Sequence, residues 1–168
     1  MQYDYTKTAE EFVHLYEKTR RLQRPMVLID DLDKASTHMN HYRFYYAGNR
    51  YIDCYASTQN AMIEFGLRIV SERLRYSERN LSLAFELCHD LTVYFFAAKV
   101  LCCPEYDKGI IAFYVKYQSF VPPMPEDLDY MIDGVLILAE KVMDRIDDLI
   151  KQIQFEQKNK PNPPKHYE

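Results

Sequence analysis

The strongest constraint on the fold is an amphipathic pattern near the C-terminus. Apolar residues recur there at steps of four and three positions, the spacing of one helix face: Leu128, Ile132, Val135, Ala139, Val142, Ile146, Leu149 and Ile153. The pattern predicts a helix over Glu126–Gln157, roughly 45 Å long at 1.5 Å per residue. From Val142 onward its apolar stripe has two possible neighbours, the sheet of its own chain or a second copy. We keep both alternatives open.

The residues before this helix change between the helical period of 3.6 and the strand period of 2. The region Met26–Asn40 is compatible with either a short strand or a loop. The other predicted elements are a helix over residues 8–23, a hairpin over 41–57 with its turn at Gly48–Asn49, a strand over 61–74, a helix over 77–91, and strands over 93–103 and 110–121.

The resulting order, α-β-β-β-α-β-β-α, predicts an α+β fold. Hairpins that alternate with single helices favour an antiparallel five-stranded sheet with the helices packed on one face. We expect one domain over residues 1–158. The polar, proline-rich segment 159–168 is expected to be a disordered tail.

Charge and hydropathy exclude some classes of protein. The formal net charge is -4, with 21 basic and 25 acidic residues, whereas nucleic-acid binders usually carry a basic surface. No segment has the ~18 consecutive apolar residues that read as a membrane span, and the first residues lack the apolar run of a secretory signal. The four cysteines lack the spacing of a disulfide framework, which favours a reducing, cytoplasmic location. We therefore expect no nucleic-acid or membrane partner.

The segment Leu87–Cys103 holds three of the four cysteines and one histidine, so it is the first candidate for a metal or thiol site. Cys102 and Cys103 are neighbours in a predicted strand and point to opposite faces, which prevents them from sharing one ion. Cys88 and Cys102 fall on apolar faces, as Cys54 does, and buried cysteine packs as a small hydrophobic residue. We interpret these three as core and Cys103 as the exposed thiol. No metal site, cofactor or catalytic residue is predicted.

Two acidic groups are also weak candidates for metal sites. Asp30, Asp31 and Asp33 resemble the start of a calcium loop, but Ala35 and Ser36 stand where a ligand and the loop glycine are needed. Glu140, Asp144 and Asp148 follow one another at helical spacing without the Glu-x-x-His pairs of a di-iron site. Solvated carboxylates explain both groups.

Tyrosines on the predicted second face of the sheet are the candidate binding residues. Tyr45, Tyr51, Tyr55 and Tyr114 fall there beside charged residues: Arg43, Asp53, Glu64, Arg68 and Lys116. Tyrosine buries a large area at low entropic cost, which is typical of protein contact surfaces. The alternative is that tyrosine stands there only because it is a good strand residue. Stacking of RNA bases on this face is disfavoured by the acidic balance.

The segment LSLAFELCHDLTVYFFAAKVLCCPEYDKGIIAFYVKYQSFVPPMPEDLDYMIDGVLILAEKV resembles the YbjN-like bacterial family, which has the type III secretion chaperone-like fold. The shared pattern is a helix, a polar joint, two strands and a closing helix after an acidic segment. With the preceding strands, the resemblance covers residues 42–150. It implies a non-enzymatic module, often dimeric, with a chaperone-like or regulatory role. We therefore expect a homodimer that binds a protein partner of unknown identity, with a small enzyme using a spatially assembled Cys/His site as the alternative.

Overall fold

The structure is a computed structural model, and it describes residues 7–19, 26–29, 38–47, 50–95, 98–122, 124 and 127–159. Within these residues the fold is α+β, with a six-stranded antiparallel sheet and three helices. Three sequence predictions fall outside the described residues: the aspartates at 30, 31 and 33, the turn at Gly48–Asn49, and the tail from residue 160 on.

The sheet has the order β1-β2-β3-β4-β6-β5, and all neighbouring strands are antiparallel. The strands are β1 (Met26–Leu28), β2 (Met39–Ala47), β3 (Arg50–Ser57), β4 (Met62–Arg75), β5 (Ala98–Glu105) and β6 (Ile110–Phe120). The prediction of five strands was wrong by one. The sixth is β1, which pairs with β2 and has only three residues, too few to show an alternating pattern.

The first helix, α1 (Ala9–Thr19), begins at a capping box formed by Thr8 and Glu11. The backbone N–H of Thr8 donates to Glu11 Oε2 at 2.8 Å, and the N–H of Glu11 donates to Thr8 Oγ1 at 3.3 Å. These reciprocal bonds satisfy donors that a helix start leaves without partners. The described part of the helix reaches Thr19, and the remaining predicted residues, 20–23, lie outside the described part.

The second helix, α2 (Glu78–Tyr94), corrects the prediction of a strand beginning at Val93. Val93 and Tyr94 are the last residues of the helix and are 72% and 81% exposed, while β5 begins only at Ala98. The run of β-branched and aromatic residues favours a strand locally, but the N–H of Phe95 still bonds the carbonyl of Leu91 at 2.9 Å. Tertiary context here outweighs propensity.

A side chain of α2 also ties the helix to the strand that follows. The Thr92 hydroxyl accepts a hydrogen bond from the Val100 N–H at 3.0 Å and donates one to the Val100 carbonyl oxygen at 3.3 Å. At the other end of α2, Ser77 caps the first turn, because its side chain accepts from the Asn80 N–H at 3.1 Å.

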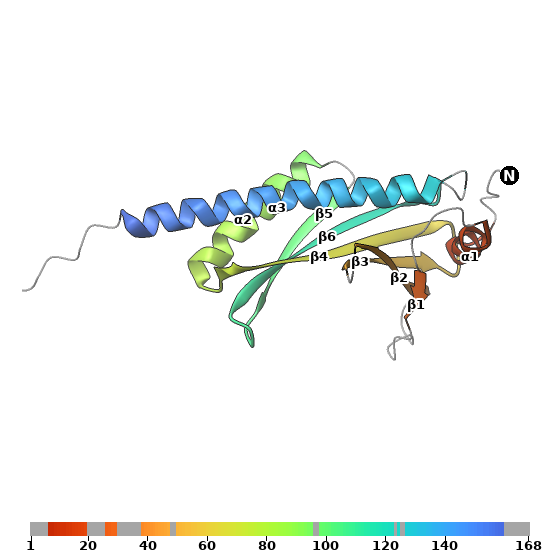
Figure 1. The fold of residues 1–168 in the computed structure, drawn as a ribbon, viewed down its shortest axis with the longest axis horizontal. Helices are drawn as coiled ribbons and strands as arrows, with labels where there is room; N and C mark the ends of the chain where they lie inside the picture. Colours follow the sequence, from red (N-terminus) through yellow and green to blue (C-terminus); the bar gives the residue numbers. More distant parts are fainter. Residues whose placement is uncertain are drawn as a thin grey trace, which may run out of the picture.

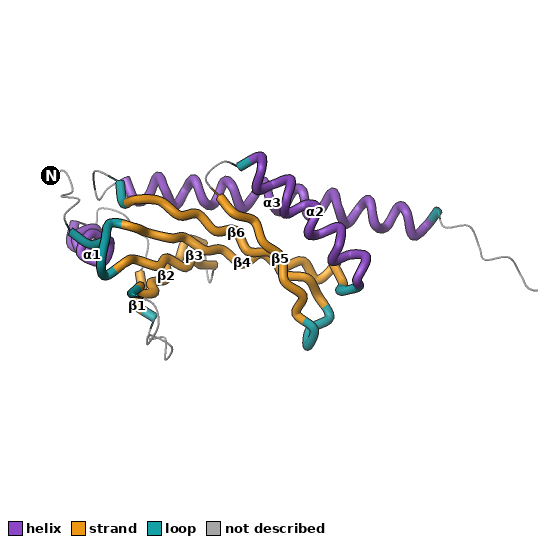
Figure 2. The backbone as a smooth tube through the Cα atoms, turned by 180° about the vertical axis from the view of Figure 1, so that it is seen from behind, coloured by secondary structure: helices purple, strands orange, loops and turns teal. Residues whose placement is uncertain are grey.

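The third helix, α3 (Leu128–Lys158), runs along the sheet in both views (Figures 1 and 2). Its buried side belongs to two hydrophobic clusters. Leu128, Ile132 and Val135 pack with α1, β2 and β3 in the first cluster. The second cluster joins the later part of α3 to α2, β5 and β6 through Ala139, Val142, Ile146, Leu149, Ile150 and Ile153. The apolar stripe from Val142 onward therefore packs against its own chain. Of the two neighbours considered for this stripe, the same chain and a second copy, the structure shows the first.

The sheet has one covered face and one open face. Along β4, Ile63, Phe65 and Ile69 are buried under the helices, and the intervening residues face the other way. The strand β4 also extends beyond its neighbour β3. Its pairing with β3 runs only from Ile63 to Gly66, whereas its pairing with β6 continues to Arg75. Residues 67–75 of β4 therefore form an edge on the side of β3.

Candidate functional site

The open face of the sheet carries the predicted tyrosines and their charged neighbours. We define the open face by nine residues of β2, β3, β4 and β6: Arg43, Tyr45, Tyr51, Asp53, Tyr55, Glu64, Arg68, Tyr114 and Lys116. Neither hydrophobic cluster contains any of them. Strand alternation therefore places all of them on the side that the helix clusters leave uncovered.

Tyr45 and Tyr51 form the aromatic centre of this face. They are direct partners across the β2–β3 hairpin, and their rings meet edge to face with centroids 5.9 Å apart. The Arg43 guanidinium carbon lies 3.8 Å from the centroid of the Tyr51 ring, within range of a cation–π interaction. Tyr51 is still 38% exposed, so this cluster presents aromatic surface to solvent.

Asp53 holds two side chains of β2 in place. Its Oδ1 accepts from Arg43 Nε at 2.9 Å and lies 2.7 Å from His41 Nε2. Burial lowers the pKa of Arg43, but the hydrogen bond and charge of Asp53 outweigh it and leave that pKa above its ordinary value. Arg43 is therefore a fixed cation, oriented over the Tyr51 ring by a carboxylate.

Tyr55 is packed more closely than the first two tyrosines. Its ring stacks on His41 with centroids 4.5 Å apart and planes at 18°. On its other side stands Gly66, where an added Cβ would meet the Tyr55 ring at 3.9 Å. This distance is an ordinary van der Waals contact, so the Tyr55 ring of β3 packs over Gly66 of β4.

Tyr114 lies apart from the other three, on β6, where its direct partner is Arg68 of β4. Arg68 Nε donates to Glu105 Oε1 at 2.9 Å, and Lys108 Nζ donates to Glu105 Oε2 at 2.9 Å. The hydrogen bond to Glu105, followed by a smaller one with Tyr114, raises the pKa of Arg68. The structure therefore groups Tyr45, Tyr51 and Tyr55 on one hairpin and leaves Tyr114 two strands away.

A hollow of about 330 Å³ adjoins the open face at the start of β3, beside β4. Tyr51, Asp53 and Arg68 line one side of it, and Leu136 and Glu140 of α3 line the other. Sequence reasoning missed this feature, because it depends on tertiary structure. It lies where β4 extends beyond β3, so that residues of α3 line a hollow at the edge of the open face.

The cysteines lie largely where the sequence predicted. Cys54 and Cys88 are buried, Cys102 is half-buried and Cys103 is exposed. Burial raises the pKa of the Cys54 thiol well above its ordinary value. Cys88 and Cys102 both pack in the second cluster. The Cys88 thiol hydrogen-bonds the Cys102 sulfur, which lowers the pKa of Cys102. No group of three potential metal ligands occurs among the described residues.

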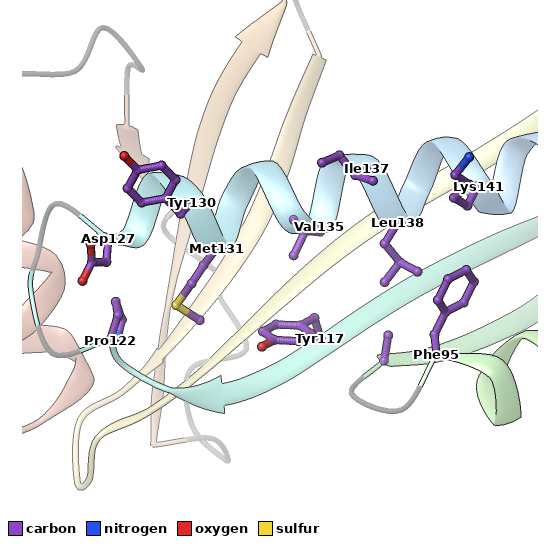
Figure 3. A pocket seen from close by; sticks show the side chains of 12 residues that line it. Phe95, Tyr117, Pro122, Asp127, Tyr130, Met131, Val135, Ile137, Leu138 and Lys141 are labelled. Carbon is purple, nitrogen blue, oxygen red and sulfur yellow. The ribbon is translucent and has the colours of Figure 1, made fainter.

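A second surface feature, which the sequence reasoning also missed, is an apolar groove beside the first half of α3 (Figure 3). It has a volume of about 760 Å³. One wall is the N-cap residue Asp127 with the part of α3 up to Lys141, and the other is formed by Phe95, Ala98 and Tyr117. The clue in the sequence was Tyr130 and Ile137, two large apolar residues that lie off the core stripe of this helix.

Comparisons with known proteins relate this chain to others through structure alone. No protein-family model matches the chain, and no curated protein matches it. An uncharacterized protein from Methanothermobacter thermautotrophicus has a similar crystal structure, with a TM-score of 0.54 and 15% sequence identity over 83% of this chain and 97% of that one. At this level of identity the likeness shows the fold alone.

The crystal structure of YbjN from E. coli, a candidate transcription regulator, is a weaker neighbour. Its TM-score is 0.42, and its sequence is 11% identical over 88% of this chain and 93% of that one. The resemblance predicted from the sequence is thus found as a weak structural likeness, and we base no functional argument on it. Separately, none of the described helices combines the length and apolar character needed to cross a membrane.

Proposed function

We propose that the protein is a non-enzymatic binding module of the bacterial cytoplasm, with a chaperone-like or regulatory role, and that its open face binds a protein partner. The observation that carries the proposal is the aromatic hairpin surface of Tyr45, Tyr51 and Tyr55, which stands opposite both hydrophobic clusters. Tyr114 forms a second, separate contact point on the same face.

The chemistry of the open face suits a polypeptide. Tyrosine rings bury much area with few rotatable bonds, and Tyr and Arg are enriched among the residues that dominate protein interfaces. Arg43 is held over Tyr51 by Asp53 before any partner arrives, so less side-chain entropy is lost on binding. The adjoining hollow offers space for one side chain of the partner.

The pairing of charges argues against a nucleic-acid partner. Each of the three cations that define the open face already has a carboxylate: Arg43 pairs with Asp53, Arg68 with Glu105, and Lys116 with Glu64. Phosphate binding draws its affinity from cations that exchange counterions for phosphates. Neutralised cations are poorly suited to that exchange, whereas they can still give register and specificity to a protein interface.

The contacts of His14, His41 and Cys103 give no support to the alternative of a small Cys/His enzyme. His41 contacts Asp53 and Tyr55, and His14 contacts Glu10 and Tyr42. The Cys103 thiol donates to the carbonyl oxygen of Pro104, at 3.7 Å. A nucleophilic thiol needs an adjacent base, and these contacts assemble no such pair.

Photo-crosslinking in the native host tests the proposal. A photoreactive phenylalanine analogue replaces Tyr51 in one variant and Tyr106 in the control, which is 68% exposed in the β5–β6 turn. We expect a discrete crosslinked protein from position 51 and none from position 106. With that partner purified, the Tyr45→Ala/Tyr51→Ala variant should bind about 30-fold more weakly, the effect of losing a dominant contact. Equal crosslinking at both positions, or unchanged affinity, would contradict the proposal.

A further inference from the structure

The exposed side of the first half of α3 has a symmetric sequence. Seven residues on one side of the helix form what we name the α3 stripe: Asp127, Tyr130, Met131, Gly134, Ile137, Leu138 and Lys141. Gly134 is at the centre, Asp127 stands seven positions before it and Lys141 seven positions after it. Between centre and ends, a pair of large apolar residues lies three and four positions away in each direction.

The stripe borders the core side of the helix, where its half-buried members Met131 and Leu138 pack against the two clusters, and it continues onto the exposed side. The core residues Leu128, Ile132 and Val135 are at most 2% exposed, whereas Tyr130 is 76% and Ile137 59% exposed. Figure 3 shows the two exposed side chains directed away from the sheet, with Met131 and Leu138 directed toward the groove. Burying large apolar side chains is favourable, so the exposed side chains of Tyr130 and Ile137 are an unfavourable surface to leave in water.

Gly134 weakens the helix of a single chain but suits a close helix pair. Glycine inside a helix is less favourable than alanine. An added Cβ at Gly134 would have no neighbour within 4 Å, so the packing of the single chain does not require glycine there. A missing side chain at a helix crossing lets two backbones approach closely. The groove beside the stripe then has room for side chains from the other helix.

We infer that a second copy of this chain covers the α3 stripe, with the two α3 helices antiparallel about a two-fold axis through Gly134. In such a pair, residue i of one copy faces residue j of the other, and j faces i. Asp127 then faces the partner's Lys141, Tyr130 faces the partner's Leu138, and Met131 faces the partner's Ile137. The two-fold axis repeats each of these contacts, so each occurs twice in the dimer.

The charges of Asp127 and Lys141 determine whether the two α3 helices pair in a parallel or an antiparallel arrangement. Neither Asp127 nor Lys141 forms an ion pair with another described residue, and each lies about 10 Å from Gly134 along the helix, at 1.5 Å per residue. A parallel pair would place aspartate opposite aspartate and lysine opposite lysine. Like charges at an interface suppress a pairing, and opposite charges favour it, so only the antiparallel arrangement satisfies both ends.

This interface is independent of the proposed function. The α3 stripe belongs to the helix layer, and the open face lies on the opposite side of the sheet. Changes to Tyr45 and Tyr51 should leave the oligomeric state unchanged, and changes to the stripe should leave the photo-crosslink at position 51 in place. The two ideas can therefore fail separately.

Charge reversal of the full chain tests the pairing, with the dimer dissociation constant measured by sedimentation equilibrium. Asp127→Lys and Lys141→Asp should each weaken the dimer by about tenfold or more, because each creates two like-charge contacts. The double variant should restore the wild-type constant. Lys151→Asp is the control, with the same change of charge on α3 outside the stripe, and it should have no such effect.

A substitution at the centre tests the close approach. Gly134→Leu removes the glycine that permits it, and the variant should be monomeric while keeping its helical circular dichroism, because leucine favours a helix. A wild-type chain that stays monomeric at high concentration would overturn the inference. So would a dimer that tolerates Gly134→Leu, or single reversals that weaken the dimer without recovery in the double variant.

Discussion

The two faces of the sheet differ in what their side chains contact. On β3, Ile52 and Cys54 are fully buried against the helices, whereas Tyr51 and Asp53, next to them in the chain, contact charged and aromatic neighbours on the open face. The covered face therefore accounts for stability, and the open face is available for recognition. The two faces alternate residue by residue along each strand. A substitution on the covered face can therefore test stability with little effect on the proposed binding surface. A substitution at the next residue, on the open face, can test binding with little effect on stability.

Cysteine labelling should show the largest difference between the faces. Cys103 is exposed, while Cys54 is fully buried on the covered face and burial raises the pKa of its thiol. Only the thiolate reacts with iodoacetamide, and Cys54 must await an opening of the structure. In the native protein Cys103 should react faster by a factor of about 10³ or more, given ordinary domain stability. Urea should abolish the difference, and rapid native labelling of Cys54 would refute the assignment of faces.

A pair of aromatic truncations gives the next largest effect. Phe113→Ala removes a ring that is 0% exposed in the second cluster, and it should lower the free energy of unfolding by about 3–5 kcal/mol. Tyr51→Ala, on the open face, should lower it by less than about 1 kcal/mol, as expected for a surface substitution. Urea denaturation followed by circular dichroism measures both. Similar losses for the two variants would show that the open face is part of the core.

The smallest effect concerns an ion pair on the open side. Hydrogen bonds from Arg68 and then Lys108 lower the pKa of Glu105. A carboxyl whose pKa is lower in the folded state stabilises the protein above its unfolded pKa, about 4.3 for glutamate, and this contribution disappears as the pH falls through the folded value. Glu105→Gln should therefore be slightly less stable than wild type at pH 7 and equal to it in strong acid. Asp107→Asn, the same charge change in the same turn, should show no such dependence. An effect that persists in acid would contradict the assignment.

Much of the fold follows from local periodicity, and the errors occur where periodicity is short or ambiguous. The alternation of Ile63, Phe65 and Ile69 correctly predicts β4 and its buried side, because a strand with one covered face must alternate. The strand β1 was left undecided because three residues have no period. Val93 and Tyr94 were placed in a strand because their side chains favour one, although the hydrogen bonds of α2 extend past them.

The candidate site was predictable in outline for the same reason. Once the hairpin register is known, Tyr45, Tyr51 and Tyr55 must share a face. What periodicity does not give is the role of Asp53 in holding both Arg43 and His41, or the hydrogen bond between Cys88 and Cys102, which depends on how α2 crosses β5. The symmetry about Gly134 was visible in the sequence, but it means little until the structure shows which side of α3 is exposed.

The overhang of β4 beyond β3 has a consequence for solubility. A strand edge without a neighbour exposes backbone donors and acceptors that can recruit a foreign strand and begin aggregation. Arg68, Glu72, Arg73 and Arg75 place charge along this length of β4, and Arg73 lies 3.7 Å from Asp147 of α3. Charged side chains along an edge strand oppose its pairing with a strand of another chain. Residues that resemble ordinary surface charge thus keep the longest strand of the sheet from acting as a template for fibrils.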